Sequence, residues 1–229
     1  MQPTTPTQSP NTDEQISVWL QGLLTIAWAD GNFDPTEQSL IASITHQDLT
    51  QADNSISFQA VSLEDLSSTF KPDPKLAENF LRTAVMVALA DGTFSSSEDE
   101  VLHQYSEAIG CGSEMLDALR LTLCQEEKEP ETGAVTLTPH PEVRHDLLDP
   151  VRDWLDGLEI QDPKVARFLC KMIPAQCPFE RDITLFGRKV VHIPPMCKLN
   201  PLYEQLVGMR FRALSYLADE CNEDVTPYV

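Results

Sequence analysis

A segment that occurs twice constrains the fold of this chain more than any other feature. Residues 29–33 read Ala-Asp-Gly-Asn-Phe and are followed by Glu37, and residues 90–94 read Ala-Asp-Gly-Thr-Phe and are followed by Glu98. In both copies the glutamate follows the phenylalanine by four residues, and each copy follows an apolar run with helical periodicity. One helix-turn-helix unit used twice is the simplest explanation.

Start and stop signals surround both copies. Thr12 with Gln15 and Ser95 with Glu98 have the form of capping boxes, while Asp34-Pro35 and Asp73-Pro74 pair an N-cap with a proline in the first helical turn. We expect Gly31 and Gly92 to end helices in left-handed turns. Short helices are also expected at 62–70 and 113–125, so the first half is predicted to be all-α with about six helices.

The charge of the chain is large and unevenly distributed. The 229 residues carry a net charge of −20, and 25 of the 36 acidic side chains but only 6 of the 16 basic ones lie in residues 1–150. This asymmetry indicates two modules, and the acidic one would repel nucleic acids and anionic membranes. We therefore expect a protein partner with a basic surface. The sequence contains neither an 18-residue apolar run nor a signal peptide, so we expect no transmembrane segment and a cytoplasmic location.

Composition divides the chain further. We predict a disordered tail at 1–11, an acidic helical domain at 12–125, a linker at 126–146 and a second domain at 147–225. In the second domain, apolar spacing predicts helices near 148–158, from Pro163 to Ile173, and at about 201–220 after an Asn200-Pro201 cap. Residues 183–193 read either as a short β-hairpin or as an irregular packed loop. The predicted fold class is mainly all-α, a helical bundle plus a small helical module.

Two stretches of the sequence resemble known protein families. The repeated Ala-Asp-Gly-x-Phe-x-x-x-Glu motif resembles the TerB-like family of helical domains, named for tellurite resistance, over residues of about 15–125. Residues of about 150–225 look like the C-terminal domain of "Mo-dependent nitrogenase" proteins of cyanobacteria, on strings such as Ile173-Pro-Ala-Gln-Cys-Pro-Phe-Glu-Arg-Asp182 and His192-Ile-Pro-Pro-Met-Cys-Lys-Leu-Asn-Pro201. The second resemblance implies a family of unassigned biochemistry, because the catalytic nitrogenase subunits are far longer chains.

The acidic turns supply candidate ligands for Ca²⁺ or Mg²⁺. Hard cations prefer oxygen ligands, which here are Asp30, Asp34, Glu37, Asp91 and Glu98. An EF-hand is excluded, since the glycine is at the second position of the loop instead of the sixth. The alternative is that Asp34, Glu37 and Glu98 only cap helices.

Thiols and an imidazole supply a second candidate metal site. Cys170, Cys177, His192 and Cys197 have the ligand types for zinc or iron, although the paired C-x2-C spacing of zinc sites is missing. If the hairpin closes, its two flanks meet and these side chains approach one another. The alternative is that the thiols are packed and dry, as buried cysteines often are.

Basic residues interleaved with phenylalanines gather in the same region: Arg181, Arg188, Lys189, Lys198, Arg210 and Arg212. We interpret them as a face that docks on the acidic module or on an acidic partner. Common catalytic motifs are missing, and Cys177 with His192 is the one thiol–imidazole pair worth testing. The favoured function is a non-catalytic interaction or regulatory protein with no catalytic residues and no certain cofactor. A metal-binding protein, with Ca/Mg or Zn/Fe, is the first alternative, and a thiol enzyme is the second.

Overall fold

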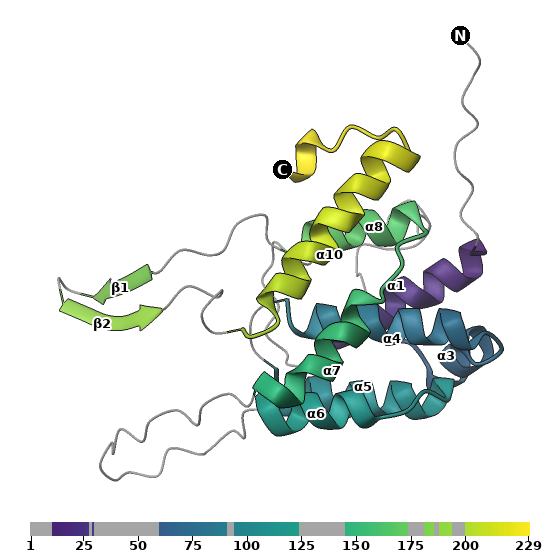
Figure 1. Cartoon of the computed structure of the whole chain (residues 1–229), viewed down its shortest axis with the longest axis horizontal. Coiled ribbons are helices and arrows are strands. Elements are labelled where there is room, and N and C mark those ends of the chain that lie inside the picture. Colours follow the sequence, from purple (N-terminus) through teal and green to yellow (C-terminus); the bar gives the residue numbers. More distant parts are fainter. Residues whose placement is uncertain are drawn as a thin grey trace, which may run out of the picture.

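The computed structural model describes residues 11–27, 29, 60–90, 94–123, 145–173, 181–185, 188–193 and 200–229. Helices make up nearly all of this part, with one small hairpin (Figure 1). The elements are α1 (Asp13–Ala27), α3 (Leu63–Phe70), α4 (Pro74–Ala88), α5 (Ser96–Ile109), α6 (Glu114–Leu123), α7 (His145–Asp156), α8 (Pro163–Met172), β1 (Arg181–Leu185), β2 (Arg188–Ile193) and α10 (Tyr203–Ser215). The predicted all-α class is confirmed, and no helix in these ranges is both long enough and apolar enough to cross a membrane.

The helix starts follow the signals in the sequence. The Thr12–Gln15 capping box forms at α1, with the Thr12 amide donating to Gln15 Oε1 at 2.8 Å. Asp73 caps α4 through the amides of Lys75 and Leu76, and Ser95 with Glu98 makes a reciprocal capping box at α5. The last helix departs from its prediction. Asn200 Oδ1 accepts from Leu202, and the helix begins one residue after Leu202, without a side-chain cap.

The two repeat copies follow equivalent helices. Helices α1 and α4 each have 15 residues, and each ends two residues before the first alanine of its motif. The same turn follows both, since the Ala29 amide donates to Ile26 O at 2.9 Å and the Ala90 amide donates to Val87 O at 3.1 Å. Gly31, Gly92 and the second helix predicted for the first copy lie outside the described residues.

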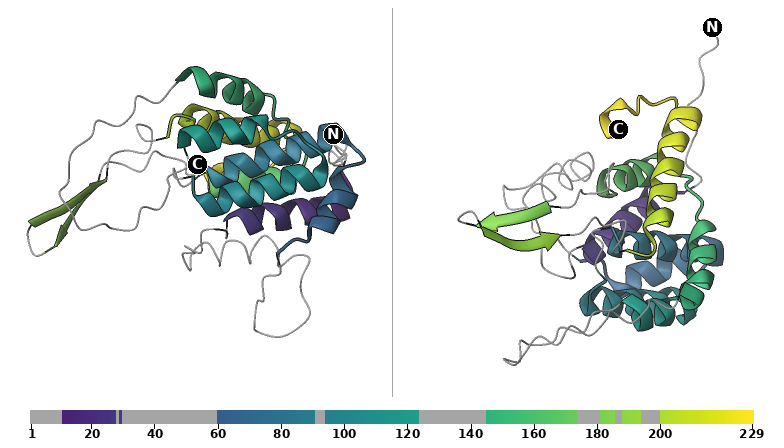
Figure 2. Two further views of the ribbon diagram at one scale, coloured as in Figure 1. Left: turned by 90° about the horizontal axis from the view of Figure 1, so that it is seen from below. Right: turned by 60° about the vertical axis from the view of Figure 1, so that its left-hand side comes forward.

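Helix α4 is buried on nearly every side. Its sequence from Phe80 onward is almost wholly apolar, and the side chains of Thr83 to Ala88 are each at most 5% exposed. A helix that is hydrophobic all round has to be enclosed by other elements. Helices α1, α3 and α5 pack against α4, while α7, α8 and α10 lie along the side of this group (Figure 2).

An aromatic cluster joins α4 to the other N-terminal helices. The ring of Phe80 stacks on Phe70 at 4.4 Å between centroids, and Trp19 meets both rings edge-on at 5.7 and 5.8 Å. Tyr105 of α5 closes the cluster beside Phe80 at 5.9 Å, and its hydroxyl donates to Gly22 O. Such perpendicular and offset ring pairs stabilise a core beyond their buried area.

The opposite side of α4 is covered by residues from the second half of the chain. Glu78 Oε1 accepts from Trp154 Nε1 at 3.0 Å and from Arg82 at 2.9 Å, and the Arg82 guanidinium lies over the Trp154 ring. Asn79 makes two bonds with the backbone of Glu159, at 2.6 and 2.9 Å. As a result, the helices on both sides of the predicted linker share one hydrophobic core.

The hairpin and the C-terminus complete the structure. Strands β1 and β2 pair antiparallel with Arg181 opposite Ile193, and an irregularity interrupts the register after Ile183. The hairpin alternative is therefore confirmed over the loop alternative. Helix α10 continues into a π-helical turn (Tyr216–Glu220), which packs against α8.

Two glycines test the packing of this fold. A Cβ on Gly22 would lie 2.8 Å from the Phe80 ring, whereas a Cβ on Gly208 of α10 would have no atom within 4 Å. We expect Gly22→Ala to lower the free energy of unfolding by about 1–3 kcal/mol, because the ring has no room to move. We expect Gly208→Ala to raise it by up to about 1 kcal/mol through helix propensity. Urea unfolding at low protein concentration measures both, and equal effects of the two variants would contradict the described packing.

Candidate functional site

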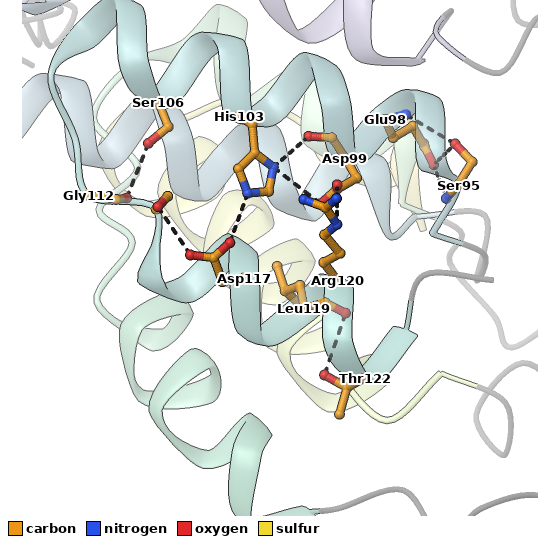
Figure 3. A network of polar contacts seen from close by, with 11 residues as sticks. Ser95, Glu98, Asp99, His103, Ser106, Gly112, Asp117, Leu119, Arg120 and Thr122 are labelled. Atoms are coloured by element: carbon orange, nitrogen blue, oxygen red, sulfur yellow. Dashed lines mark hydrogen bonds and ion pairs between the residues drawn. The ribbon is translucent and has the colours of Figure 1, made fainter. Parts of the chain in front are cut away.

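The first turn of α5 organises a polar site at the α5–α6 edge of the bundle (Figure 3). Glu98 Oε2 accepts from the Ser95 amide at 2.9 Å and from the Ser95 hydroxyl at 2.7 Å, and Glu98 is only 6% exposed. This geometry gives Glu98 the role of a helix cap, which was the alternative to cation binding. The cap fixes where α5 begins and so sets the position of Asp99, the next residue.

Helix α5 presents an imidazole between two carboxylates. His103 Nδ1 lies 2.8 Å from the backbone oxygen of Asp99 and 3.3 Å from Asp99 Oδ1. His103 Nε2 lies 3.3 Å from Asp117 Oδ1 on α6, and Arg120 Nε of α6 lies 3.5 Å from Asp99 Oδ2. We call Asp99, His103, Asp117 and Arg120 the α5–α6 clamp, because its charged contacts join these two helices.

Burial makes Asp99 the unusual member of this clamp. Asp99 is 5% exposed, and within the described part of the chain its Oδ1 accepts no hydrogen bond. Desolvation raises the pKa of Asp99, while His103 and Arg120 lower it and Asp117 raises it further. Burial outweighs the cations, so the clamp holds a carboxylate that gains a proton more readily than an ordinary aspartate.

The clamp can take up a proton and alter the contact between two helices, and its geometry does not suit a metal ion. Both ring nitrogens of His103 face carboxylate or carbonyl oxygens, which leaves neither with an open side for a cation. Among the residues that the structure describes, no group of three His, Cys, Asp or Glu side chains is arranged to hold a metal. The site is thus an electrostatic contact with a titratable centre.

Most of the predicted metal ligands cannot be placed. Asp30, Asp34, Glu37 and Asp91 lie outside the described residues, as do Cys177, Cys197 and Lys198. Arg181, Arg188, Lys189 and His192 lie on the hairpin, where only the backbone is described: His192 pairs with Asp182, Lys189 with Thr184, Arg188 with Leu185 and Arg181 with Ile193. The predicted Ca/Mg and Zn/Fe sites and the thiol–imidazole pair therefore stay predictions.

Cys170 is the predicted thiol ligand whose surroundings the structure does describe. It is 4% exposed in the face of α8 that packs on the core, and burial raises its pKa to about 11. A thiol in this state is protonated at neutral pH and weakly nucleophilic, because the thiolate is both the nucleophile and the metal ligand. These surroundings resemble those of a packed structural thiol.

The two described residues of the predicted basic face both bind inside their own half of the chain. Arg210 is 6% exposed and donates to Cys170 O at 2.6 Å and to Tyr228 O. Arg212 donates to Asp156 O at 2.8 Å and to Leu158 O at 3.2 Å, and so binds the carbonyls at the end of α7. The burial of Arg210 does not fit the docking role predicted for it, since its guanidinium instead ties α10 to α8 and to the C-terminal segment.

The sequence interpretation missed the α5–α6 clamp. Asp99 and His103 stand four residues apart, which places both on one face of a helix. The sequence could therefore have indicated this pair. The partners Asp117 and Arg120 lie on the next helix, so their approach depends on how α6 folds back after Gly110. That glycine ends α5 with a φ of 78°, in the left-handed conformation expected of such an end.

The raised pKa of Asp99 predicts a pH-dependent stability. The folded chain keeps a proton on Asp99 above the ordinary value of 3.8, whereas the unfolded chain loses it, so the Asp99 contribution to stability falls as pH rises through the folded pKa. Asp99→Asn removes this titration. We expect the free energy of unfolding of the variant minus that of the wild type to increase with pH over an interval that begins near the ordinary value of 3.8.

Urea unfolding at several pH values across this interval measures the difference. Asp13→Asn is the matched control, because the Asp13 side chain is 98% exposed and its removal relieves no burial. A difference that stays constant would show that the ion pairs to His103 and Arg120 cancel desolvation, and one that falls with pH would show that they dominate.

One family is similar to the second half of the chain. Residues 147–229 match the family described as "Mo-dependent nitrogenase C-terminus", which confirms the resemblance seen in the sequence of this half. The match covers all but the first two residues of α7, together with α8, the hairpin, α10 and the C-terminal segment. No curated protein and no solved structure showed a significant similarity to the chain. Nothing in these comparisons supports the TerB-like resemblance of residues 15–125.

Proposed function

We propose that this chain is a non-catalytic interaction or regulatory protein of cyanobacterial type, whose acidic helical half docks on a basic surface of a partner protein. One observation carries the proposal: helices α5 and α6 use their basic side chains internally and leave acidic ones at the surface. His103 and Arg120 are the basic residues in these two helices, and both contact Asp99 or Asp117.

The remaining carboxylates face solvent. Glu100 and Glu107 are seven residues apart on α5, which places them on the same side of the helix, and Glu114 is exposed in the first turn of α6. None of the three side chains forms an ion pair or hydrogen bond with another described residue. We call Glu100, Glu107 and Glu114 the acidic face. Uncompensated surface charge of this kind attracts an oppositely charged partner and speeds its association.

The charge balance supports a protein partner over other classes. Residues 1–150 carry 25 acidic and 6 basic side chains, a field that disfavours nucleic-acid phosphates. The TerB-like assignment of residues 15–125 belongs to this proposal as well. The equivalent ends of α1 and α4 and their shared turn support an internal repeat, which is what the repeated motif implied.

A charge-neutralising variant tests the proposal. The 229-residue chain carrying Glu100→Gln, Glu107→Gln and Glu114→Gln is used to capture partners from a cyanobacterial lysate, beside the unmodified chain. The matched control carries Glu14→Gln, Glu64→Gln and Asp219→Asn, which removes three exposed carboxylates outside α5, α6 and α10. We expect a partner that binds the wild type and the control but not the acidic-face variant.

Salt supplies the second criterion. At about 1 M salt the Debye length falls to about 3 Å, so a complex held by the acidic face should dissociate. A partner that both triple variants retain, or that stays bound at this salt concentration, would contradict the proposal.

A further inference from the structure

Helix α10 exposes apolar side chains that the described part of the chain does not cover. Phe211 is 69% exposed and Val207 is 44% exposed, and they lie one turn apart on the same side of the helix. Leu214, half-buried, continues the same side by one further turn. Exposed apolar groups that line up along one helix mark an interaction surface more often than single ones do.

An open position lies beside these side chains. Gly208 precedes Phe211 by three residues and so lies on the same side of α10, and a Cβ placed on it would meet no atom within 4 Å. The surface therefore carries a large protruding ring next to a position without a side chain. One helix face presents both a projection and the depression that would receive it.

We propose that this face, made by Glu204, Val207, Gly208, Phe211 and Leu214, binds a second copy of the same chain in a two-fold dimer. When two α10 helices cross antiparallel about a point between Gly208 and Phe211, each Phe211 ring lies over the Gly208 of the other copy. A two-fold interface has to be self-complementary in this way, because the same residues meet from both sides. Glycine lets two helix backbones approach closely where a side chain would hold them apart.

The charges favour a second copy at this face and favour the antiparallel arrangement. Residues 151–229 carry 11 acidic and 10 basic side chains, so two copies repel each other far less here than through their acidic halves. Glu204 is the charged member of the face. In the antiparallel arrangement the two Glu204 residues are about 16 Å apart along the helix axes, beyond the Debye length of about 8 Å at physiological salt. A parallel arrangement would place them together.

The size of the face sets the expected strength. A single helix face is smaller than the roughly 800 Å² per partner of a stable interface, so the dimer should be weak, with a dissociation constant in the micromolar range. Such a dimer forms and dissociates with concentration. It leaves the acidic face on α5 and α6 free, and it does not depend on the proposed function.

Sedimentation velocity on the full chain, at concentrations from about 1 to 200 μM, tests the dimer over this range. We expect the weight-average mass to rise toward twice that of the chain. Phe211→Glu and Gly208→Leu should each raise the dissociation constant at least about tenfold, the first by placing a charge in the contact and the second by filling the depression. Leu121→Glu is the matched control, because Leu121 is 80% exposed on α6, away from α10, and should leave the dissociation constant unchanged.

Circular dichroism establishes whether each variant is folded. If Phe211→Glu does not fold, Gly208→Leu alone tests the proposal. A chain that stays monomeric up to the highest concentration would overturn the proposal. A partner other than a second copy would then have to bind this face. Dimerisation that survives both α10 variants, or that Leu121→Glu abolishes, would overturn it as well.

Discussion

The burial of α4 is the constraint on which the rest of this structure depends. The second half of α4 is apolar on all sides, and such a helical segment is stable in water only when other elements enclose it. Helices α1, α3 and α5 enclose the side that carries Phe80, through a cluster of aromatic rings. The opposite side carries Glu78 and Arg82, and Trp154 of α7 covers it. Neither half of the chain encloses α4 alone.

The surfaces that remain outside this core differ in character. The edge formed by α5 and α6 holds a titratable clamp, and beside it the acidic face points to solvent. Helix α10, on the other side of the molecule's shared core, uses its two arginines to hold backbone carbonyls and exposes Val207 and Phe211 instead. The charged surface and the apolar surface therefore come from different halves of the chain.

Local signals in the sequence predicted the helices well. Capping boxes such as Ser95 with Glu98, and caps followed by proline such as Asp73-Pro74, act over three residues, and the structure contains them as read. Such signals do not predict contacts between residues that are far apart in the sequence. The linker composition and the charge asymmetry indicated separate modules. Nothing local to Trp154 or Asn79 shows that Trp154 binds Glu78 or that Asn79 binds the backbone of Glu159.

The same dependence on contacts between distant residues explains why the sites were harder to predict than the helices. Arg210 looked like a surface residue because basic residues cluster around it in the sequence, but burial depends on how α10 packs on α8. Asp99 is one of two acids in the first turn of α5, and its burial and its contacts with Asp117 and Arg120 of α6 exist only in the folded chain. Residues that act within one turn can be read from a sequence, whereas a pKa or an exposed fraction is set by neighbours from other elements.

Native-state hydrogen exchange on the full chain tests the shared enclosure of α4 most directly. If both halves enclose this helix, the amides of α4 and those of α8 exchange through one cooperative opening, with a free energy equal to that of global unfolding. Trp154→Ala should then lower the protection of both helices together. Exchange of α8 and α10 through a separate opening of lower free energy, with α4 still protected, would contradict the account.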